Sequence, residues 1–175
     1  MAQSFGPALE LDRGLLRLLR ERGHHDPGVV RAIAGFSRTG EHGAIWFALG
    51  TIGAALSAEG SQRRACFKRG IAITGLAYGL NYAVKLGVKR RRPEFEDLPP
   101  LTPVVSDLSF PSAHATTSFA AAAAYSRALP LASPLLYGAA TMLALSRPYL
   151  GVHYPSDVLA GAALGTLTGR LLRCQ

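Results

Sequence analysis

Five long segments of this 175-residue chain carry almost no charge, and this limits its fold more than any other feature. A helix that crosses a bilayer needs about 20 mostly apolar residues, with a range of about 17 to 25. The segments lie at or below the low end of that range, and several are rich in alanine. They cover residues 42–58, 70–88, 108–126, 128–146 and 158–172.

These segments are apolar on every face, which decides between two kinds of helical protein. Five buried helices of a soluble bundle are the alternative, but so small a chain cannot bury five such helices. We therefore predict an all-α fold: a polytopic membrane helical bundle with about five spans. Residues 1–175 would form a single membrane-embedded domain, with its helical core at 42–172.

The chain is basic, with a formal net charge of +8. In a soluble protein this excess would suggest nucleic acid. Here the basic residues lie between long uncharged runs, so we expect a bilayer surface and anionic phosphate groups as partners, and no nucleic acid. The amino terminus lacks the pattern of a cleaved signal peptide. The sequence contains no signal for an oligomeric state.

Residues 9–22, ahead of the first uncharged segment, predict an amphipathic helix. Four leucines share one helical face, three arginines share another, and Leu9 and Leu16 lie off the leucine stripe. This pattern is typical of a helix lying in the headgroup layer, and a surface helix packed on the bundle is the alternative. The stripe is Leu11, Leu15, Leu18 and Leu19, and the arginines are Arg13, Arg17 and Arg20.

Small residues recur every four positions in two of the segments. Such spacing lets membrane helices approach closely, although an alanine- and glycine-rich composition alone would also produce it. The two cysteines are too few for a disulfide framework, and their spacing does not suggest a metal site. The residues are Gly75 and Gly79, then Gly161, Gly165 and Gly169, and the cysteines are Cys66 and Cys174.

A basic run follows the second uncharged segment. Lys85 lies inside the apolar run, where a charge is costly and is therefore a functional candidate. Arg92 follows seven residues later, two helical turns on, and shares a face with Lys85. A charge run after a span is more often an anchor at the membrane surface, and we interpret Arg90 and Arg91 in that way.

A second polar cluster, Phe110–His114, opens the third uncharged segment. If a helix starts here, its unpaired amides and positive dipole end favour a bound phosphate. Ser112 can cap that helix or bind an oxyanion. His114 is a candidate functional residue, although a lone histidine at such a place is more often an interfacial residue.

The third cluster follows the fourth segment. If a helix begins near Tyr154, His153 and Asp157 lie about one turn apart. A carboxylate beside an imidazole sets its tautomer and stabilises its charged form. Arg147 adds a fork-shaped donor suited to phosphate oxygens. With successive spans antiparallel, all three clusters fall on the same side of the membrane, which predicts a single site.

The three clusters resemble the motifs of the type 2 phosphatidic acid phosphatase superfamily in order and spacing. One position departs from the family pattern, since Ala113 replaces a glycine. Alanine keeps the backbone N–H but restricts positive φ, so binding through that amide requires helical dihedrals at residue 113. The matching motifs are Lys85 to Arg92-Pro93, then Pro111-Ser112-Ala113-His114, then Ser146-Arg147 to His153 and Asp157.

This resemblance implies a role for each residue. His153 would attack phosphorus and form a phosphohistidine, Asp157 would orient it, and His114 would protonate the leaving oxygen. The cations would neutralise the charge that Mg²⁺ neutralises elsewhere, so the resemblance implies no metal and no cofactor. The phosphate would be held by Lys85, Arg92, Ser112, Arg147 and the amide of Ala113.

The resemblance also implies a substrate class and a location. The short chain is similar to the bacterial lipid phosphatases of the superfamily, so we expect a phosphatase in the cell membrane that acts on a lipid-linked phosphate. Candidates are decaprenylphosphoryl-5-phosphoribose, a polyprenyl diphosphate and phosphatidylglycerophosphate. A membrane protein that binds or transports phospholipid without hydrolysis is the alternative, but binding alone does not require His114, His153 and Asp157.

The distribution of Lys and Arg bears on the orientation of this site. By raw count more Lys and Arg lie on the active-site side, which favours a cytoplasmic active site. The cations assigned to phosphate binding and to the 9–22 helix have another explanation, so we set them aside. Fewer Lys and Arg then remain on the active-site side than in the 59–69 loop and carboxyl terminus. Loops on the cytoplasmic side of a membrane protein carry an excess of Lys and Arg. We therefore expect an active site that faces away from the cytoplasm.

Overall fold

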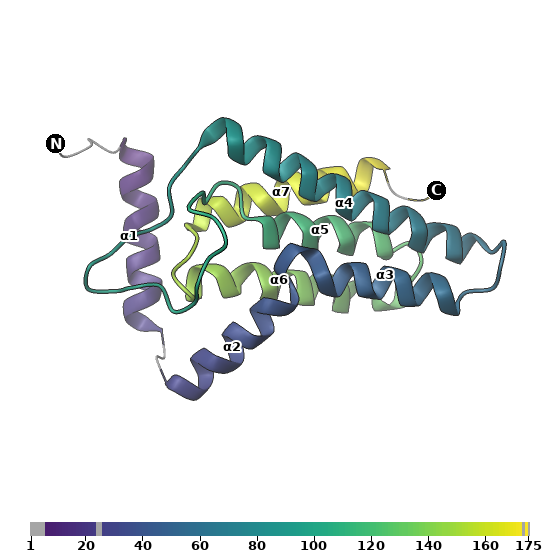
Figure 1. Ribbon diagram of the computed structural model, residues 1–175, viewed down its shortest axis with the longest axis horizontal. Helices are drawn as coiled ribbons and strands as arrows, with labels where there is room; N and C mark the ends of the chain where they lie inside the picture. Colours follow the sequence, from purple (N-terminus) through teal and green to yellow (C-terminus); the bar gives the residue numbers. More distant parts are fainter. Residues whose placement is uncertain (1–5, 24–25, 173, 175) are drawn as a thin grey trace.

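The computed structural model describes residues 6–23, 26–172 and 174, and this part of the chain is built from helices (Figure 1). Within it, the only β structure is one isolated bridge between Arg91 and Leu108. The predicted all-α class is therefore confirmed. In order, the helices are α1 (Pro7–Arg22), α2 (Pro27–Thr39), η1 (Glu41–Gly43), α3 (Ala44–Leu56), α4 (Gln62–Val88), α5 (Ala113–Tyr125), η2 (Pro130–Ala132), α6 (Ser133–Tyr149) and α7 (Pro155–Leu172).

Helices α3 to α7 correspond to the five uncharged segments, but several of their boundaries differ. Helix α4 begins at Gln62, well before residue 70, because Ser61 caps it by accepting a hydrogen bond from the Arg64 amide at 3.2 Å. Helix α5 begins only at Ala113, since Pro111 lacks an amide hydrogen and restricts the residue before it. Helix α2 was not predicted from the sequence.

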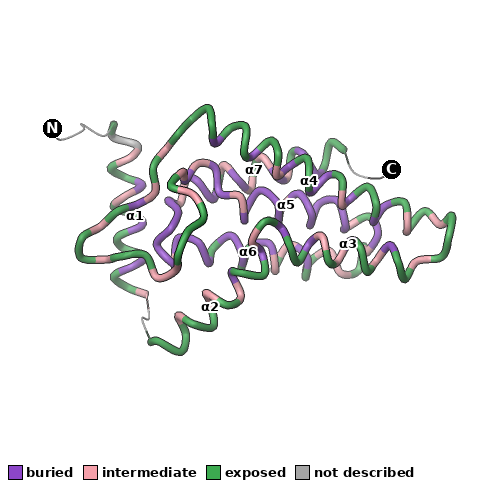
Figure 2. The backbone as a smooth tube through the Cα atoms, in the orientation of Figure 1, coloured by how far each residue is buried: buried purple, intermediate pink, exposed green. Residues whose placement is uncertain are grey.

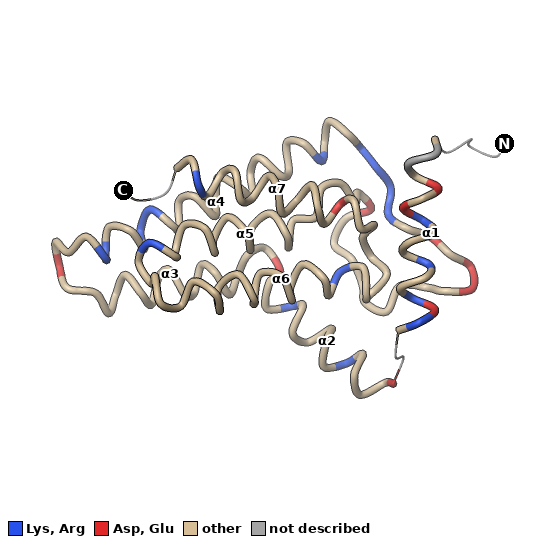
Figure 3. Tube along the Cα trace, turned by 180° about the vertical axis from the view of Figure 1, so that it is seen from behind, with Lys and Arg blue, Asp and Glu red and all other residues tan. Residues whose placement is uncertain are grey.

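The centre of the bundle is rich in alanine, joined by a few large side chains such as Trp46, Phe67 and Tyr125, while many large apolar side chains lie on the outside. Helix α5 runs through this centre, and its alanines are almost completely buried (Figure 2). Charged residues gather toward the two ends of the bundle (Figure 3). A surface of this kind suits contact with lipid and not with water. Exposed apolar residues on α3, α4, α6 and α7 include Ile52, Leu56, Leu76, Leu86, Leu135, Met142, Leu145, Leu159 and Leu167.

Length limits what these helices can cross. Among the described residues, α4 is the one helix that is long and apolar enough to span a membrane by length and composition. Helices α3 and α5 have 13 residues each, which gives about 20 Å at about 1.5 Å per residue. A hydrocarbon core is about 30 Å thick. The number of spans therefore stays a prediction.

The glycine repeat of α7 packs directly against α5. A Cβ added at Gly161 would lie 2.6 Å from the Ser112 carbonyl oxygen, and one at Gly169 would lie 2.7 Å from that of Ala120. The predicted close approach is thus present on α7. It is wrong for α4, because a Cβ at Gly75 or Gly79 would meet nothing within 4 Å.

These two sets of glycines form a matched test of packing. A Cβ at Gly165 would overlap the Thr116 carbonyl oxygen, so Gly165→Ala should force α5 and α7 apart and cost about 1–3 kcal/mol. Gly75→Ala adds its methyl group to open space and should keep or slightly raise stability, because alanine favours a helix. Thermal unfolding in detergent would compare the two variants. Equal melting temperatures would contradict this account of the α5–α7 contact.

Helix α1 lies across the end of the bundle where α4 ends and α7 begins (Figure 1). Its docking face carries Leu16, which is fully buried, together with Asp12 and Arg20. The leucine stripe points away from the bundle and is exposed. The helix is therefore packed on the bundle by one face, with its leucine stripe uncovered, and its position in the headgroup layer stays a prediction.

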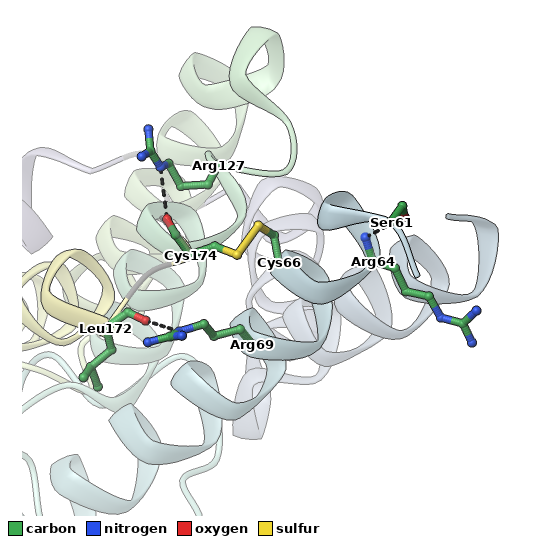
Figure 4. Close-up of a disulfide and its surroundings, with 7 residues drawn as sticks. All are labelled: Ser61, Arg64, Cys66, Arg69, Arg127, Leu172 and Cys174. Carbon is green, nitrogen blue, oxygen red and sulfur yellow. Dashed lines mark hydrogen bonds between the residues drawn. A yellow bond between two sulfur atoms is a disulfide. The ribbon is translucent and has the colours of Figure 1, made fainter. Parts of the chain in front are cut away.

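The opposite end of the bundle carries a disulfide. Cys66, on the second turn of α4, is bonded to Cys174 at the carboxyl terminus, with their Cα atoms 5.3 Å apart (Figure 4). Arg69 reinforces the contact by donating to the Leu172 carbonyl at 2.6 Å. The two cysteines thus form one disulfide, and not a framework of several disulfides. His24 and His25, which follow α1 in the sequence, lie outside the described residues.

Candidate active site

A cavity of about 210 Å³ opens at the α1 end of the bundle, beside the loop between α4 and α5. Residues from all three sequence clusters line it, as expected if successive helices alternate in direction. Asp157 and Ser112 lie behind its wall and are completely buried. The sequence-predicted residues that line the cavity are Lys85, Arg92, Ala113, His114, Arg147 and His153.

The geometry around His153 defines its tautomer. Its Nδ1 lies 3.3 Å from Asp157 Oδ2, and its Nε2 lies 3.1 Å from Arg92 NH1. A guanidinium can only donate, so Nε2 must accept, and the proton of a neutral ring is on Nδ1, facing the carboxylate. Nε2 therefore carries the lone pair, as a nucleophile requires.

The charge state of His153 follows from its surroundings. Burial lowers the pKa of His153 well below its usual 6.5, and the nearby cations, Arg92 first, lower it further. The ring is 2% exposed. It therefore stays neutral at neutral pH and gains a proton only when the pH falls well below 6.5. A neutral imidazole is the form that can attack phosphorus.

Three cations surround this nitrogen, each held by the protein. Arg92 donates to the carbonyls of Ser106 (2.5 Å) and Val152 (2.6 Å), and Lys85 Nζ donates to the Leu108 carbonyl (2.9 Å). Arg147 NH1 donates to Ser37 Oγ at 2.7 Å. The buried Nε of Arg147 has no hydrogen-bond partner among the described residues.

The start of α5 adds neutral donors. Ser112 is the N-cap residue, but its hydroxyl makes no capping bond and, within the described chain, has no partner. Its amide donates to the Asp157 carbonyl at 2.9 Å. Ala113 is the first residue of α5, so the helical backbone that its amide requires for anion binding is present. Alanine in place of the family glycine therefore causes no backbone conflict here.

His114 is held by a residue that was not singled out in the sequence. Its Nε2 lies 3.0 Å from the backbone carbonyl of Ser37, on α2. The hydroxyl of Ser37 also contacts Arg147, so one buried residue orients two candidate site residues. Gly40 lets α2 approach, because a Cβ there would lie 3.0 Å from His114 Cδ2. Nothing in the sequence indicated that Ser37 would hold His114 and Arg147, because no element had been assigned to its segment.

Arg90 is not the surface anchor that the sequence analysis assigned. Its side chain is 18% exposed and forms ion pairs with Asp157, at 2.9 Å, and with Asp12 of α1, at 2.7 Å. The first turn of α7 and α1 both approach the end of α4 from separate parts of the chain. These contacts could not be deduced from the sequence, where Arg90 and the exposed Arg91 look alike.

The donor set of the cavity is cationic, with imidazoles and amides. Among the described residues, no group of three or more His, Cys, Asp or Glu is placed to hold a metal ion. The arrangement can hold a phosphate dianion, present a neutral imidazole to phosphorus and place a second imidazole at the same cavity. These are the requirements of phosphoryl transfer, which depends mainly on positioning and charge neutralisation.

Comparisons with known proteins agree with this geometry. Residues 70–175 match the PAP2 superfamily. The chain is 39% identical, over 83% of its length and 80% of the relative, to decaprenylphosphoryl-5-phosphoribose phosphatase of Mycobacterium tuberculosis. A transmembrane PAP2-type phosphatidylglycerolphosphate phosphatase from Bacillus subtilis superposes with a TM-score of 0.72 at 23% identity, covering 97% of this chain and 86% of that one. LpxE of Aquifex aeolicus superposes with a TM-score of 0.71 at 25% identity, covering 98% and 97%.

Proposed function

Because this chain belongs to the PAP2 superfamily, we propose that it removes the 5-phosphate of decaprenylphosphoryl-5-phosphoribose through a phosphohistidine on His153. The chain is a membrane phosphatase that acts on a lipid-linked phosphate. The convergence of Lys85, Arg92 and Arg147 on the His153–Asp157 pair is the observation that carries the proposed mechanism. The identity of the substrate rests on the 39% identity to the mycobacterial phosphatase.

In this mechanism the Nε2 lone pair of His153 attacks phosphorus, and the bond to the ribose oxygen breaks. His114 donates its Nε2 proton to the Ser37 carbonyl, so it must carry a second proton on Nδ1, which it gives to the ribose oxygen as it leaves. Asp157 stabilises the His153 imidazole as it becomes cationic. Water then gives a proton to the neutral His114, attacks the phosphohistidine and releases inorganic phosphate, which restores the neutral His153. The phosphate oxygens are held throughout by Lys85, Arg92, Arg147, Ser112 and the amide of Ala113.

Several polar side chains in the cavity lining support a polar leaving group. The mainly apolar segment 102–105 lines part of the cavity, and beyond the site residues named above the polar lining residues are Arg38, Glu41, His42 and Tyr78. His42 Nδ1 lies 2.8 Å from the Tyr78 hydroxyl. A pentose offers hydroxyl groups to such side chains, and a second, diester-linked phosphate would suit Arg38. The phosphate end of a polyprenyl diphosphate joins directly to an apolar tail, which matches these residues less well.

A substrate panel tests the proposal. Purified enzyme in detergent, with EDTA present throughout, should release phosphate fastest from decaprenylphosphoryl-5-phosphoribose. Polyprenyl diphosphate and phosphatidylglycerophosphate should be poorer substrates by kcat/KM. A higher kcat/KM for either of them would overturn the substrate assignment. Activity lost in EDTA and restored by Mg²⁺ would overturn the mechanism.

We propose that α3 to α7 all cross the bilayer and that α1 lies in the headgroup layer with its leucine stripe toward lipid. The exposed apolar side chains of the bundle support the spans. The direction of α1, across the bundle end, supports the interfacial position (Figure 1). In this arrangement the cavity opens at the membrane surface, where the phosphate of a lipid-linked substrate is located.

For orientation we propose that the active site faces away from the cytoplasm, as the Lys and Arg distribution favours. The Cys66–Cys174 pair lies at the other end, and disulfides persist mainly in oxidising compartments, which favours the reverse. A cysteine at Ser61, with Cys66 and Cys174 replaced, distinguishes the two. Our orientation predicts no labelling of intact cells by a membrane-impermeant thiol reagent and labelling after lysis. Labelling of intact cells would reverse it.

A further inference from the structure

Arg90 bridges two buried carboxylates from opposite ends of the sequence. Its NH1 donates to Asp157 Oδ1 at 2.9 Å and to Ser156 Oγ at 2.7 Å, and its NH2 donates to Asp12 Oδ2 at 2.7 Å. The guanidinium carbon lies 4.0 Å from the centre of the Tyr154 ring. Contacts on several sides therefore hold this side chain in one position.

The contact with Asp157 completes the environment of the carboxylate. Asp157 Oδ2 accepts from the Tyr154 amide at 2.9 Å and faces His153 Nδ1, while Oδ1 faces Arg90. The carboxylate is fully buried. A buried charge that loses its partner is strongly destabilised, and the group then neutralises or moves. Either change would weaken its hold on the Nδ1 proton of His153.

Asp12 holds Arg90 from the other side. It is 5% exposed, and its Oδ1 accepts from the Ser156 amide at 3.0 Å. The Ser156 hydroxyl also bonds to its Oδ2. A continuous line of contacts therefore runs from Asp12 through Arg90 and Asp157 to His153. Its first member belongs to α1, far from the other three in the sequence.

We propose that Arg90 positions Asp157, and through it the nucleophile His153, and that Asp12 makes the docked α1 helix part of this arrangement. The inference rests on the proposed phosphohistidine mechanism. Arg90 does not line the cavity, so it acts on catalysis without touching the phosphate. The loss should therefore fall on kcat, with KM unchanged.

The test compares neighbouring arginines. Arg90→Ala should lower kcat by about 10- to 100-fold, the range found where a partner that orients a ligating histidine is removed. Arg91→Ala removes the same charge from the adjacent, exposed position and should keep kcat. Arg90→Lys should fall between Arg90→Ala and wild type, because one ammonium cannot reproduce a two-pronged contact. Its intermediate activity keeps the test valid if Arg90→Ala fails to fold.

Combining variants identifies the residue through which Arg90 acts. In an Asp157→Asn background, Arg90→Ala should cause little further loss of kcat, because both changes act on one unit. If Arg90→Ala lowered kcat by the same factor in both backgrounds, or only raised KM, the proposed role of Arg90 would be overturned. Asp12→Asn should lower kcat by a smaller factor, and unchanged kcat would overturn the part assigned to α1. Failure of the proposed function would look different, since the wild-type enzyme itself would release no phosphate.

Discussion

Replacing His153 with alanine is expected to abolish phosphate release, because the covalent intermediate cannot form. The structure gives this histidine the features of a nucleophile: a neutral ring, a proton on Nδ1 facing Asp157, and an Nε2 lone pair beside Arg92. We expect kcat to fall by about 10⁴-fold or more, the scale seen when a catalytic nucleophile is removed. Substrate should still bind, because the cations remain.

Trapping of the intermediate checks this assignment. Wild-type enzyme quenched during turnover of ³²P-labelled substrate should carry acid-labile, base-stable label on His153, and His153→Ala should carry none. Substrate binding by the variant, measured directly, serves as the folding control. Label on a different residue, or turnover by His153→Ala near the wild-type rate, would contradict the mechanism.

Replacing His114 with alanine should have an effect that depends on the leaving group. His114 lies at the cavity with Nε2 held by the Ser37 carbonyl at 3.0 Å, and its proposed task is to protonate the departing oxygen. A sugar hydroxyl is a poor leaving group and needs that proton, so the loss should be about 10²- to 10⁴-fold. A nitrophenolate leaves without protonation, so the rate with p-nitrophenyl phosphate should change little.

The two substrates act as each other's control. A fold defect lowers both rates together, whereas loss of a general acid lowers only the rate with the alkyl phosphate. His114→Ala should also still form labelled phosphohistidine from p-nitrophenyl phosphate. Equal losses with the two substrates would show that His114 supports the site in some way other than proton donation.

Much of the helical core was predictable, because helices are local structures. The five uncharged segments correspond to α3–α7, and alternating helix direction placed three separated motifs at one end of the bundle. Boundaries were less predictable. Ser61 extends the start of α4 toward the amino terminus, to Gln62, and Pro111 delays the start of α5 until Ala113. Helix α2 was missed, although its Ser37 contacts both His114 and Arg147.

The sequence alone predicted the residues of the candidate site, and the resemblance of its motifs to a family predicted their roles. The spacing between His153 and Asp157 brings these side chains together within about one helical turn, independently of the remaining fold. The predicted shared helix face of Lys85 and Arg92 is wrong, because α4 ends at Val88 and Lys89 is left-handed. Arg92 lies in the following loop, where the carbonyls of Ser106 and Val152 hold it. The charge-free segments likewise follow from local composition. These features depend on neighbours along the chain, so they can be deduced from the order of residues.

Only the tertiary structure decided how similar residues divide between different tasks. Gly165 packs on α5 while Gly75 meets open space, and Arg90 is drawn between two buried carboxylates while Arg91 stays exposed. The physical reason is the same in each case. A side chain's environment depends on which helix faces it, and that is decided by contacts between segments far apart in the sequence.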